Sequence, residues 1–387
     1  MRSFINWLLS SKSRDARQMC GHARKILEEQ RDQLNPQAVK AMEDSIRELR
    51  SKAITQRDAK LLQSGMAELE TCATKWLKPY PYASYRENVE VFLVAIAVAM
   101  GIRTFFLQPF KIPTGSMQPT LYGVTADNYI GDPNFKIPGA LAGWFSSIFQ
   151  GASYYHVVAK DDGAFSLVDA QPTRFLFNIS QKFRIGKDVY TVWWPPDNFF
   201  KHAGLADGMM FQKGQDVIKM RAVSGDHLFV DRLSYNFRRP HRGDIVVFQT
   251  VGIRGQGMTD DQHYIKRLVG LPGETVQIGD DRHLVIDGKR LDKTTLHFEK
   301  IYDEVNWKDG GYLGHANGRV RPLGMTYFED SNFQYKIPPN QYLVMGDNTL
   351  NSSDSRYWGS FQTTNVIGKS FFVYWPFNSR FGWWGHD

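Results

Sequence analysis

The sequence predicts a mainly β protein, in which an antiparallel, barrel-like or sandwich-like domain follows an N-terminal helical hairpin and one transmembrane helix. Three observations predict this fold class. Apolar residues recur at helical spacing within residues 13–78, residues 89–110 form the most apolar run, and the chain after Lys111 breaks into short β-rich runs. We therefore expect three parts, at residues 1–88, 89–110 and 111–387.

Composition limits the class of protein. A chain of 387 residues with a mean hydropathy of −0.40 is too polar for several membrane spans, and an aromatic content of 14% excludes general disorder. The net charge of +7 is concentrated in residues 1–88, which carry 16 Lys or Arg against 11 Asp or Glu. Because acidic residues are interleaved there, we interpret the charge as a solvated helix surface and predict no nucleic-acid partner.

Apolar spacing and capping residues predict helices within residues 13–78. Its apolar positions recur at alternating steps of three and four residues, at Val39, Met42, Ile46, Leu49 and Ala53. Asn35-Pro36 supplies an N-cap followed by a proline at the first helical position, while Pro79 and Pro81 close the region. These signals predict two helices that form a hairpin.

The apolar run at residues 89–110 is interpreted as a single membrane span. Its uncharged core, from Val91 to Ile102, is short for a span, so a buried helix of a soluble domain is an alternative. Arg103 lies near one end, where its side chain can snorkel and extend the usable stretch to about 20 residues. The positive charge on the N-terminal side predicts a cytosolic N-terminus.

The β-rich part carries runs that alternate and end at turn residues. These runs are residues 227–235, 243–250, 263–273, 283–289, 341–348 and 368–377. No alternation of strand and helix is seen, so we expect an antiparallel arrangement. Both cysteines, Cys20 and Cys72, precede this part, which therefore has neither a disulfide nor a thiolate metal site.

Two segments combine into a possible catalytic pair. Pro113 and Pro119 bracket Gly115-Ser116, so a rigid loop can hold the serine in an unusual geometry, although a serine in such a loop is usually only a turn residue. Lys266 lies in an apolar strand pattern, where alternation can turn its amine inward. Burial would lower its pKa and let it accept a proton, and a serine with a neutral lysine is a known nucleophile and base pair.

A third segment, residues 346–359, is dense in Asp, Asn and Ser, which suits a rigid polar loop beside a site. It lacks the acidic ladder of a calcium loop. Phosphate-binding and metal motifs are also absent from the sequence, so no metal and no cofactor are predicted.

Together with residues 242–248, these three segments resemble the ordered motifs of bacterial type I signal peptidases (leader peptidases). The resemblance implies that Ser116 is the nucleophile and Lys266 the general base. It also implies an oxyanion hole made by the Thr114 hydroxyl and the Ser116 amide. Ser352 would orient the lysine, with Gly346 and Asp347 also supporting the site.

The resemblance implies two further sets of residues. One is a supporting ion-pair set, made by Asp354, Arg356 and Arg267. The other lines shallow pockets for small substrate side chains: Phe110, Ile112, Met117, Leu121, Tyr264 and Ile265. The implied protein is a serine endopeptidase of the bacterial cytoplasmic membrane, whose partners are signal-peptide-bearing preproteins and membrane lipids.

The chain also departs from the family pattern. Thr349-Leu350 stands where the family commonly has Arg-Asp, so the third loop is expected to be tethered differently. Two insertions lie at about residues 124–224 and 279–339, and residues 283–289 in the second are expected to be one arm of a hairpin. In the first, residues 137–152 carry Trp144, Phe145, Ile148 and Phe149, which we expect to form a small core rather than a membrane-surface contact.

Two alternatives to the interpretation as a signal peptidase stay open. One is a Ser/Lys maturation peptidase with a narrow substrate range, and the other is an inactive, membrane-tethered β-rich binding protein. The apolar run argues against the related self-cleaving repressors, which have no span. The intact set of Ser116, Lys266 and Thr114 argues against an inactive protein.

Overall fold

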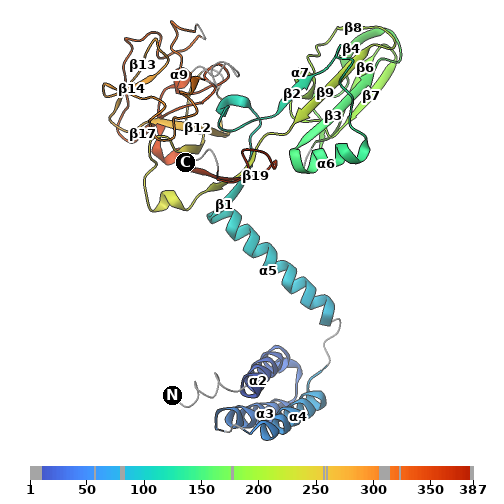
Figure 1. The fold of residues 1–387 in the computed structure, drawn as a ribbon. Helices are drawn as coiled ribbons and strands as arrows, with labels where there is room; N and C mark the ends of the chain where they lie inside the picture. Colours follow the sequence, from blue (N-terminus) through green and yellow to red (C-terminus); the bar gives the residue numbers. More distant parts are fainter. Residues whose placement is uncertain are drawn as a thin grey trace. The chain divides into compact units, whose positions relative to one another are not determined.

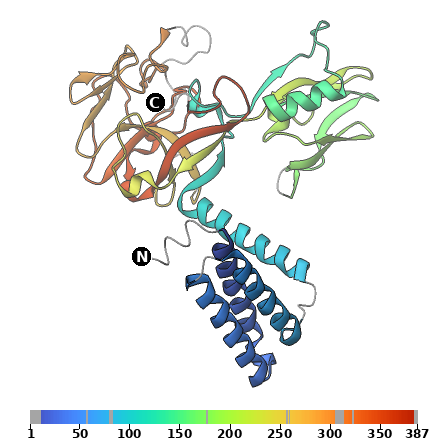
Figure 2. The same cartoon turned by 60° about the horizontal axis from the view of Figure 1, so that its bottom comes forward.

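The computed structural model describes residues 11–55, 58–78, 83–175, 178–255, 258, 260–304, 314–321 and 324–383 (Figures 1 and 2). The chain divides into two compact units, Met1–Ile96 and Ala97–Asp387.

The N-terminal unit contains three long helices, α2 (Ser11–Gln30), α3 (Pro36–Thr55) and α4 (Ala59–Trp76), with the short 3-10 helix η1 (Arg31–Gln33) between the first two. All three pack against one another (Figure 2). The prediction of a two-helix hairpin is therefore wrong. The reason is a second cap, since the Asp58 side chain accepts a hydrogen bond from the Lys60 amide at 2.9 Å and starts α4.

The predicted start and apolar face of α3 are confirmed. Asn35 Oδ1 accepts a hydrogen bond from the Ala38 amide at 2.7 Å, as an N-cap residue does. Met42, Ile46 and Leu49 are buried in the core of this unit, with Ala53 at the end of the stripe and Val39 half-buried at its edge. The thiols of Cys20 and Cys72 are both free.

Helix α5 (Ala83–Phe105) is long and apolar enough, from Tyr85 to Phe105, to cross a membrane, and none of its apolar window is buried. The helix was expected to continue to residue 110. Instead, Leu107–Lys111 form strand β1. Pro109 explains the early end, because proline lacks an amide proton and disfavours helical geometry in the residue before it.

An antiparallel sheet of seven strands organises the second unit, which confirms the predicted fold class. Its order is β1-β10-β19-β11-β12-β17-β18. After β1, the strands are β10 (His227–Asp231), β19 (Val366–Trp375), β11 (Ile245–Gln249), β12 (His263–Gly270), β17 (Gln341–Met345) and β18 (Phe361–Gln362).

The second insertion contributes strands to a four-stranded sheet, which has the order β15-β14-β13-β16. Its strands are β13 (Thr275–Ile278), β14 (Leu284–Ile286), β15 (Lys289–Arg290) and β16 (Tyr335–Lys336). Val285 pairs with Arg290 and Ile286 with Lys289, which confirms that residues 283–289 belong to a hairpin, although they contain β14 and the start of β15 rather than one arm alone.

The first insertion forms the insertion module, defined as residues 125–223. One of its sheets has the order β2-β9-β3, and the other has the order β5-β6-β4-β8 with β7 paired to β6. In chain order the elements are β2 (Thr125–Asn128), α6 (Ala140–Gln150), β3 (Ala152–Val158), β4 (Gly163–Leu167), β5 (Thr173–Arg174), β6 (Asn178–Ile185), β7 (Asp188–Trp193), α7 (Phe199–His202), β8 (Met210–Phe211) and β9 (Asp216–Val223).

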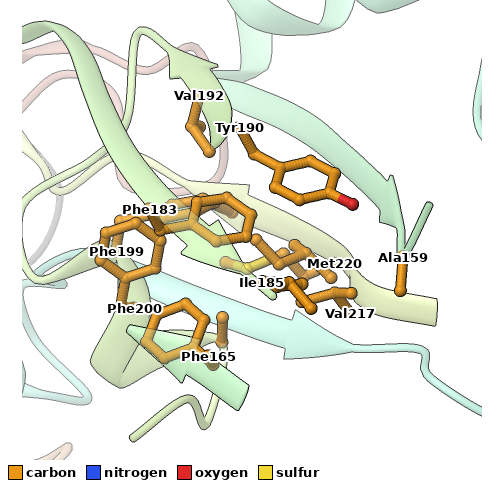
Figure 3. Close-up of a cluster of buried hydrophobic side chains, with 13 residues drawn as sticks. Ala159, Phe165, Phe183, Ile185, Tyr190, Val192, Phe199, Phe200, Val217 and Met220 are labelled. Carbon is orange, nitrogen blue, oxygen red and sulfur yellow. The ribbon is translucent and has the colours of Figure 1, made fainter. Parts of the chain in front are cut away.

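Figure 3 shows the core of this module, in which Phe165, Phe183, Phe199 and Phe200 pack against strand residues. Residues 137–152 were expected to supply a small core, and this prediction is wrong. They include α6 as a helix, but no residue of α6 is buried. The aromatic rings of β4, β6 and α7 already fill the interior, which leaves the apolar face of α6 outside it.

Candidate active site

Ser116 and Lys266 are 150 residues apart in sequence and meet in the structure. Ser116 lies in the short 3-10 helix η2 (Gly115–Met117), and Lys266 lies on β12. Lys266 Nζ makes hydrogen bonds to Ser116 Oγ at 2.8 Å and to the carbonyl of Ile265 at 3.1 Å. Each of the two residues is only 4% exposed. This is the contact that a nucleophile and its general base require.

Burial sets the protonation of the lysine. Removal from water lowers the pKa of Lys266 from its ordinary value to about 8. The carboxylates of Asp354 and Asp347 oppose this effect, while the Arg356 guanidinium adds to it. A useful fraction of the amine is therefore neutral near neutral pH and can accept the Ser116 proton.

The loop that carries the serine is held by the third polar segment. The Asn348 amide donates to the Ser116 carbonyl at 3.0 Å, and Asn348 Nδ2 donates to the Gly115 carbonyl at 3.0 Å. Gly346 allows the close approach, because a Cβ there would clash with the Ser116 carbonyl oxygen and the Ser352 hydroxyl. Asn348 was not among the predicted site residues, although its position directly after Gly346 and Asp347 was the available signal.

The predicted ion pairs form, but as two separate pairs rather than one set. Arg356 holds Asp354 through Nε to Oδ1 at 2.8 Å and Nη2 to Oδ2 at 2.7 Å. Arg267 holds Asp347 with the same two distances. Each guanidinium thus binds both oxygens of one carboxylate, so that Arg267 pairs with Asp347 and not with Asp354. All four side chains are buried.

Both pairs make further hydrogen bonds to neighbouring residues. Asp354 Oδ2 accepts from the Gly346 amide at 2.9 Å, and Asp354 also caps the short helix α9 (Ser355–Trp358). The Thr120 hydroxyl donates to Asp347 Oδ2 at 2.5 Å, close to the nucleophile loop in sequence. Thr120 was not predicted, because its partner lies 227 residues away and no local pattern marks the contact.

Thr349, which departs from the family pattern, tethers the third loop through its hydroxyl. Its hydroxyl oxygen accepts hydrogen bonds from Arg356 Nη1 and from the Ala316 amide, the latter at 2.9 Å. Arg356 Nη1 also contacts the Ala316 carbonyl at 3.4 Å. The second insertion thus reaches the buried Arg356–Asp354 pair through Thr349.

Two predicted residues lie at the site without showing the expected contact. Ser352 is buried beside Gly346, but within the described ranges its hydroxyl makes no hydrogen bond to Lys266. Thr114 is exposed just before η2, and its side chain does not cap that helix. The exposed position leaves the Thr114 hydroxyl accessible to a substrate oxygen. The catalytic roles of both residues stay predictions.

The predicted substrate-binding residues fall into two neighbouring clusters. Ile112, Met117 and Leu121 are buried in one cluster, with Phe110 and Ile265 at its half-buried edge. Tyr264 packs in the adjacent cluster, with its ring 5.5 Å from Lys266 Nζ. Among the described strands, β1 pairs only with β10 and residues 263–266 pair only with β11. Each therefore leaves one backbone edge available to an extended peptide.

In the part of the chain that the structure describes, no cluster of His, Cys, Asp or Glu is arranged to hold a metal ion. A buried serine and lysine beside hydrogen-bonded loops are suited to acyl transfer.

A comparison with protein families identifies the family to which the chain belongs. The model of the family described as signal peptidase, peptidase S26, matches residues 85–129 and 218–375, slightly more than half of the chain. The chain belongs to the signal peptidase family, peptidase S26. Ser116, Lys266 and Asp354 lie within the matched ranges, whereas residues 130–217, most of the insertion module, lie outside them.

The chain is also similar to individual signal peptidases. The chain is 33% identical to signal peptidase I of Leptolyngbya laminosa, over 40% of this chain and 62% of that protein. It is 38% identical to signal peptidase I S of Bacillus subtilis (strain 168), over 35% of this chain and 60% of that protein. The chain thus spans about three fifths of the length of these relatives. A solved signal peptidase I from Enterococcus faecalis V583 is 27% identical, over 34% of this chain and 97% of that chain, with a TM-score of 0.25.

Proposed function

We propose that this protein is a serine endopeptidase that removes N-terminal signal peptides from exported preproteins, with Ser116 as the nucleophile and Lys266 as the general base. The observation that carries the proposal is the hydrogen bond of 2.8 Å between Lys266 Nζ and Ser116 Oγ, within a buried site where the lysine pKa is lowered to about 8. Membership of the signal peptidase family supports the substrate class.

The proposed reaction is acyl transfer. Neutral Lys266 takes the proton from the Ser116 hydroxyl as its oxygen attacks the scissile carbonyl, and the resulting ammonium then protonates the leaving amine. The acyl-enzyme is hydrolysed when Lys266, neutral again, takes a proton from water, and the Ser116 oxygen leaves with that proton. The Thr114 hydroxyl and the Ser116 amide are proposed to hold the oxyanion in both steps.

Substrate specificity is proposed to rest on small side chains at the first and third positions before the cut bond. An extended peptide would add to the unpaired edges of β1 and of residues 263–266. Its short side chains would then point toward the cluster formed by Ile112, Met117 and Leu121. These side chains leave little room, which would disfavour large residues beside the cut.

The proposed location is the bacterial cytoplasmic membrane, with α5 as the single span, the N-terminus in the cytosol and the β-rich unit outside. Topology can be tested with Ser64→Cys on α4 and Met210→Cys on β8, two exposed positions, after Cys20 and Cys72 are replaced by serine. An impermeant maleimide applied to intact spheroplasts should label only Met210→Cys. Labelling of Ser64→Cys alone would reverse the orientation.

The activity is tested by incubating the detergent-solubilised full chain with a preprotein that ends its signal peptide in Ala-x-Ala, and by locating the cut by mass spectrometry. Cleavage after the second alanine is expected. Ser116→Ala should be inactive, and Ser166→Ala, at an exposed serine of β4, is the matched control. Cleavage confined to one unrelated substrate would favour a narrow maturation peptidase, and no cleavage by the folded protein would favour a binding protein.

A further inference from the structure

A groove lies between the insertion module and the strand that leads to the nucleophile loop. Its volume is about 780 Å³. From the sheet it is lined by Lys111 of β1, His227 of β10 and Trp375 of β19, and the insertion module supplies most of the remaining wall. Residues 130–217, which include most of the module, lie outside the ranges that the family model matches. Membership of the family therefore assigns no role to this wall.

Hydrogen bonds and a strained residue fix the module wall of the groove. The Tyr155 hydroxyl donates to the Trp194 carbonyl at 2.6 Å, and the Trp194 amide donates to the Ile179 carbonyl at 2.8 Å. Trp194 has a φ of 55°, in the left-handed region that bulky residues rarely adopt. Such strain persists only where the surrounding contacts fix the backbone, and it is frequent at binding sites. The wall is therefore a built feature of the fold.

Two cations in the groove share one carboxylate. Lys111 Nζ donates to Asp197 Oδ2 at 3.2 Å, and Arg174 Nη2 donates to Asp197 Oδ1 at 3.3 Å. Asn178 Nδ2 also donates to Asp197 Oδ1, at 3.2 Å. The side chains of the three charged residues are 28% to 59% exposed, so a ligand can reach them. The cluster carries a surplus of one positive charge.

His227 adds no charge to the groove near neutral pH. Burial, together with the nearby charge of Lys111, lowers the pKa of His227 to about 4. Its ring packs against Trp375 with the two ring centres 4.8 Å apart. Within the described residues, the charged lining of the groove at neutral pH therefore consists of Lys111, Arg174 and Asp197.

The position of Lys111 on β1 relates the groove to the substrate. Phe110 and Ile112 belong to the apolar cluster that small substrate side chains are proposed to contact, whereas Lys111 between them is exposed and lines the groove. Side chains alternate between the two faces of a strand, and residues opposite each other on adjacent strands share a face. A peptide on the unpaired edge of β1 that turns its first and third residues before the cut toward the cluster therefore places its second residue on the face of Lys111.

We propose that the groove is a substrate subsite for the second residue before the cut bond, and that it prefers a long, acidic side chain. This inference rests on the proposed function. A long side chain can reach the cluster of Lys111, Arg174 and Asp197, where the positive surplus attracts a carboxylate and repels an ammonium group. The groove thus affects which signal peptides are cut fastest, and not whether the bond can be cut.

The test uses the detergent-solubilised full chain and three soluble peptides that differ only in the middle residue of Ala-x-Ala, which is glutamate, glutamine or lysine. The value of kcat/KM is measured for each peptide at low ionic strength, because salt screens partly exposed charges. The glutamate peptide should be cut fastest and the lysine peptide slowest. Their values should differ roughly 3- to 10-fold, as expected when attraction to partly exposed charges is replaced by repulsion.

Variants of the groove should change this order step by step. Arg174→Gln removes the positive surplus and should bring the three values of kcat/KM close together. Lys111→Gln combined with Arg174→Gln leaves the charge of Asp197, so the preference should invert and favour the lysine peptide. Arg184→Gln, at an exposed arginine of β6, is the matched control and should keep the order of the parent chain.

Equal cleavage of the three peptides by the parent chain would overturn this inference and leave the proposed function intact. A preference for glutamate that persists in the double variant would also overturn it, because the charge would then act from elsewhere. Binding of fluorescently labelled peptides to Ser116→Ala is measured in parallel by anisotropy. Tighter binding of the glutamate peptide, with no cleavage by the folded parent chain, would support the subsite and defeat only the proposed function.

Discussion

The seven-stranded sheet and the insertion module belong to one compact unit, but they differ in the polarity of the side chains that they bury. Beside the sheet, Lys266, Arg267, Arg356, Asp347 and Asp354 are all buried. In the described part of the insertion module, no charged side chain is buried, and the core is made of aromatic and aliphatic residues (Figure 3).

This difference distinguishes the buried side chains that stabilise the fold from those that serve the proposed reaction. Burial of a charge costs free energy even when it is paired, and an apolar core of equal volume is often as stable. The insertion module has such an apolar core. The sheet keeps buried charges around Lys266, where they position the serine loop and adjust the lysine pKa. We infer that this network is kept for catalysis, and the following predictions test that inference.

The largest effect is expected from the catalytic pair. Ser116→Ala, Lys266→Ala and Lys266→Arg should each reduce cleavage on the order of 10⁵-fold or more, because the two groups act as one unit and a guanidinium cannot give up its proton. The double alanine variant should be no worse than either single variant. Single-turnover cleavage of a preprotein measures this, with circular dichroism to confirm folding. An active, folded Lys266→Ala would show that another group is the base.

Thr114 is expected to contribute less than the pair but more than any residue of the insertion module. Thr114→Val keeps the shape and removes the hydroxyl, so kcat should fall roughly 10²- to 10³-fold, the usual effect of losing one oxyanion-hole donor. KM should change little, because the oxyanion exists only in the transition state. Thr114→Ser should stay active. A kcat for Thr114→Val within a few-fold of the parent would make the hydroxyl structural.

Phe183 tests the other side of the comparison. Phe183→Ala removes a fully buried ring from the module core and should destabilise the module by roughly 3 to 5 kcal/mol. Hydrogen exchange should rise in β4, β6 and β7, while cleavage of a soluble peptide persists. Val189→Ala, at an exposed position of β7, is the control. Loss of peptide cleavage with the seven-stranded sheet still protected would mean that the module contributes to the site.

Thr349 tests whether the second insertion supports the buried charges. Thr349→Val leaves the Ala316 amide without its acceptor and weakens the contact with Arg356, which should cost about 1 to 3 kcal/mol in the free energy of unfolding. Thr349→Ser retains the hydroxyl and should restore most of the loss. Urea unfolding measures both variants. Equal stability of the valine and serine variants would show that the tether is dispensable.

The smallest effect concerns pH. Lys266 acts as a base only when neutral, so kcat/KM should rise about tenfold per pH unit up to its pKa of about 8 and then level off. Asp354 raises the lysine pKa, so Asp354→Asn should move the rise to lower pH. Rates on a soluble peptide across this range measure the profile. A rate that does not change with pH would exclude Lys266 as the titrating base.

Local patterns were sufficient to predict several elements. The N-cap at Asn35, the buried face of α3, the six β-rich runs and the hairpin at residues 283–289 each depend on neighbouring residues. They follow from the periods of helix and strand and from turn residues. The same patterns missed the cap at Asp58, where a single short-range signal split the expected hairpin into three helices.

The sequence by itself identified the residues that we propose to carry the chemistry, because the serine loop, the strand lysine and the polar loop are each recognisable as short segments. Only the tertiary structure decided their partners. Arg267 pairs with Asp347 across 80 residues, and Thr120 reaches Asp347 across 227. The exposure of α6 was decided in the same way. A helical period identifies an apolar face, but which other side chains fill the core depends on how distant segments pack.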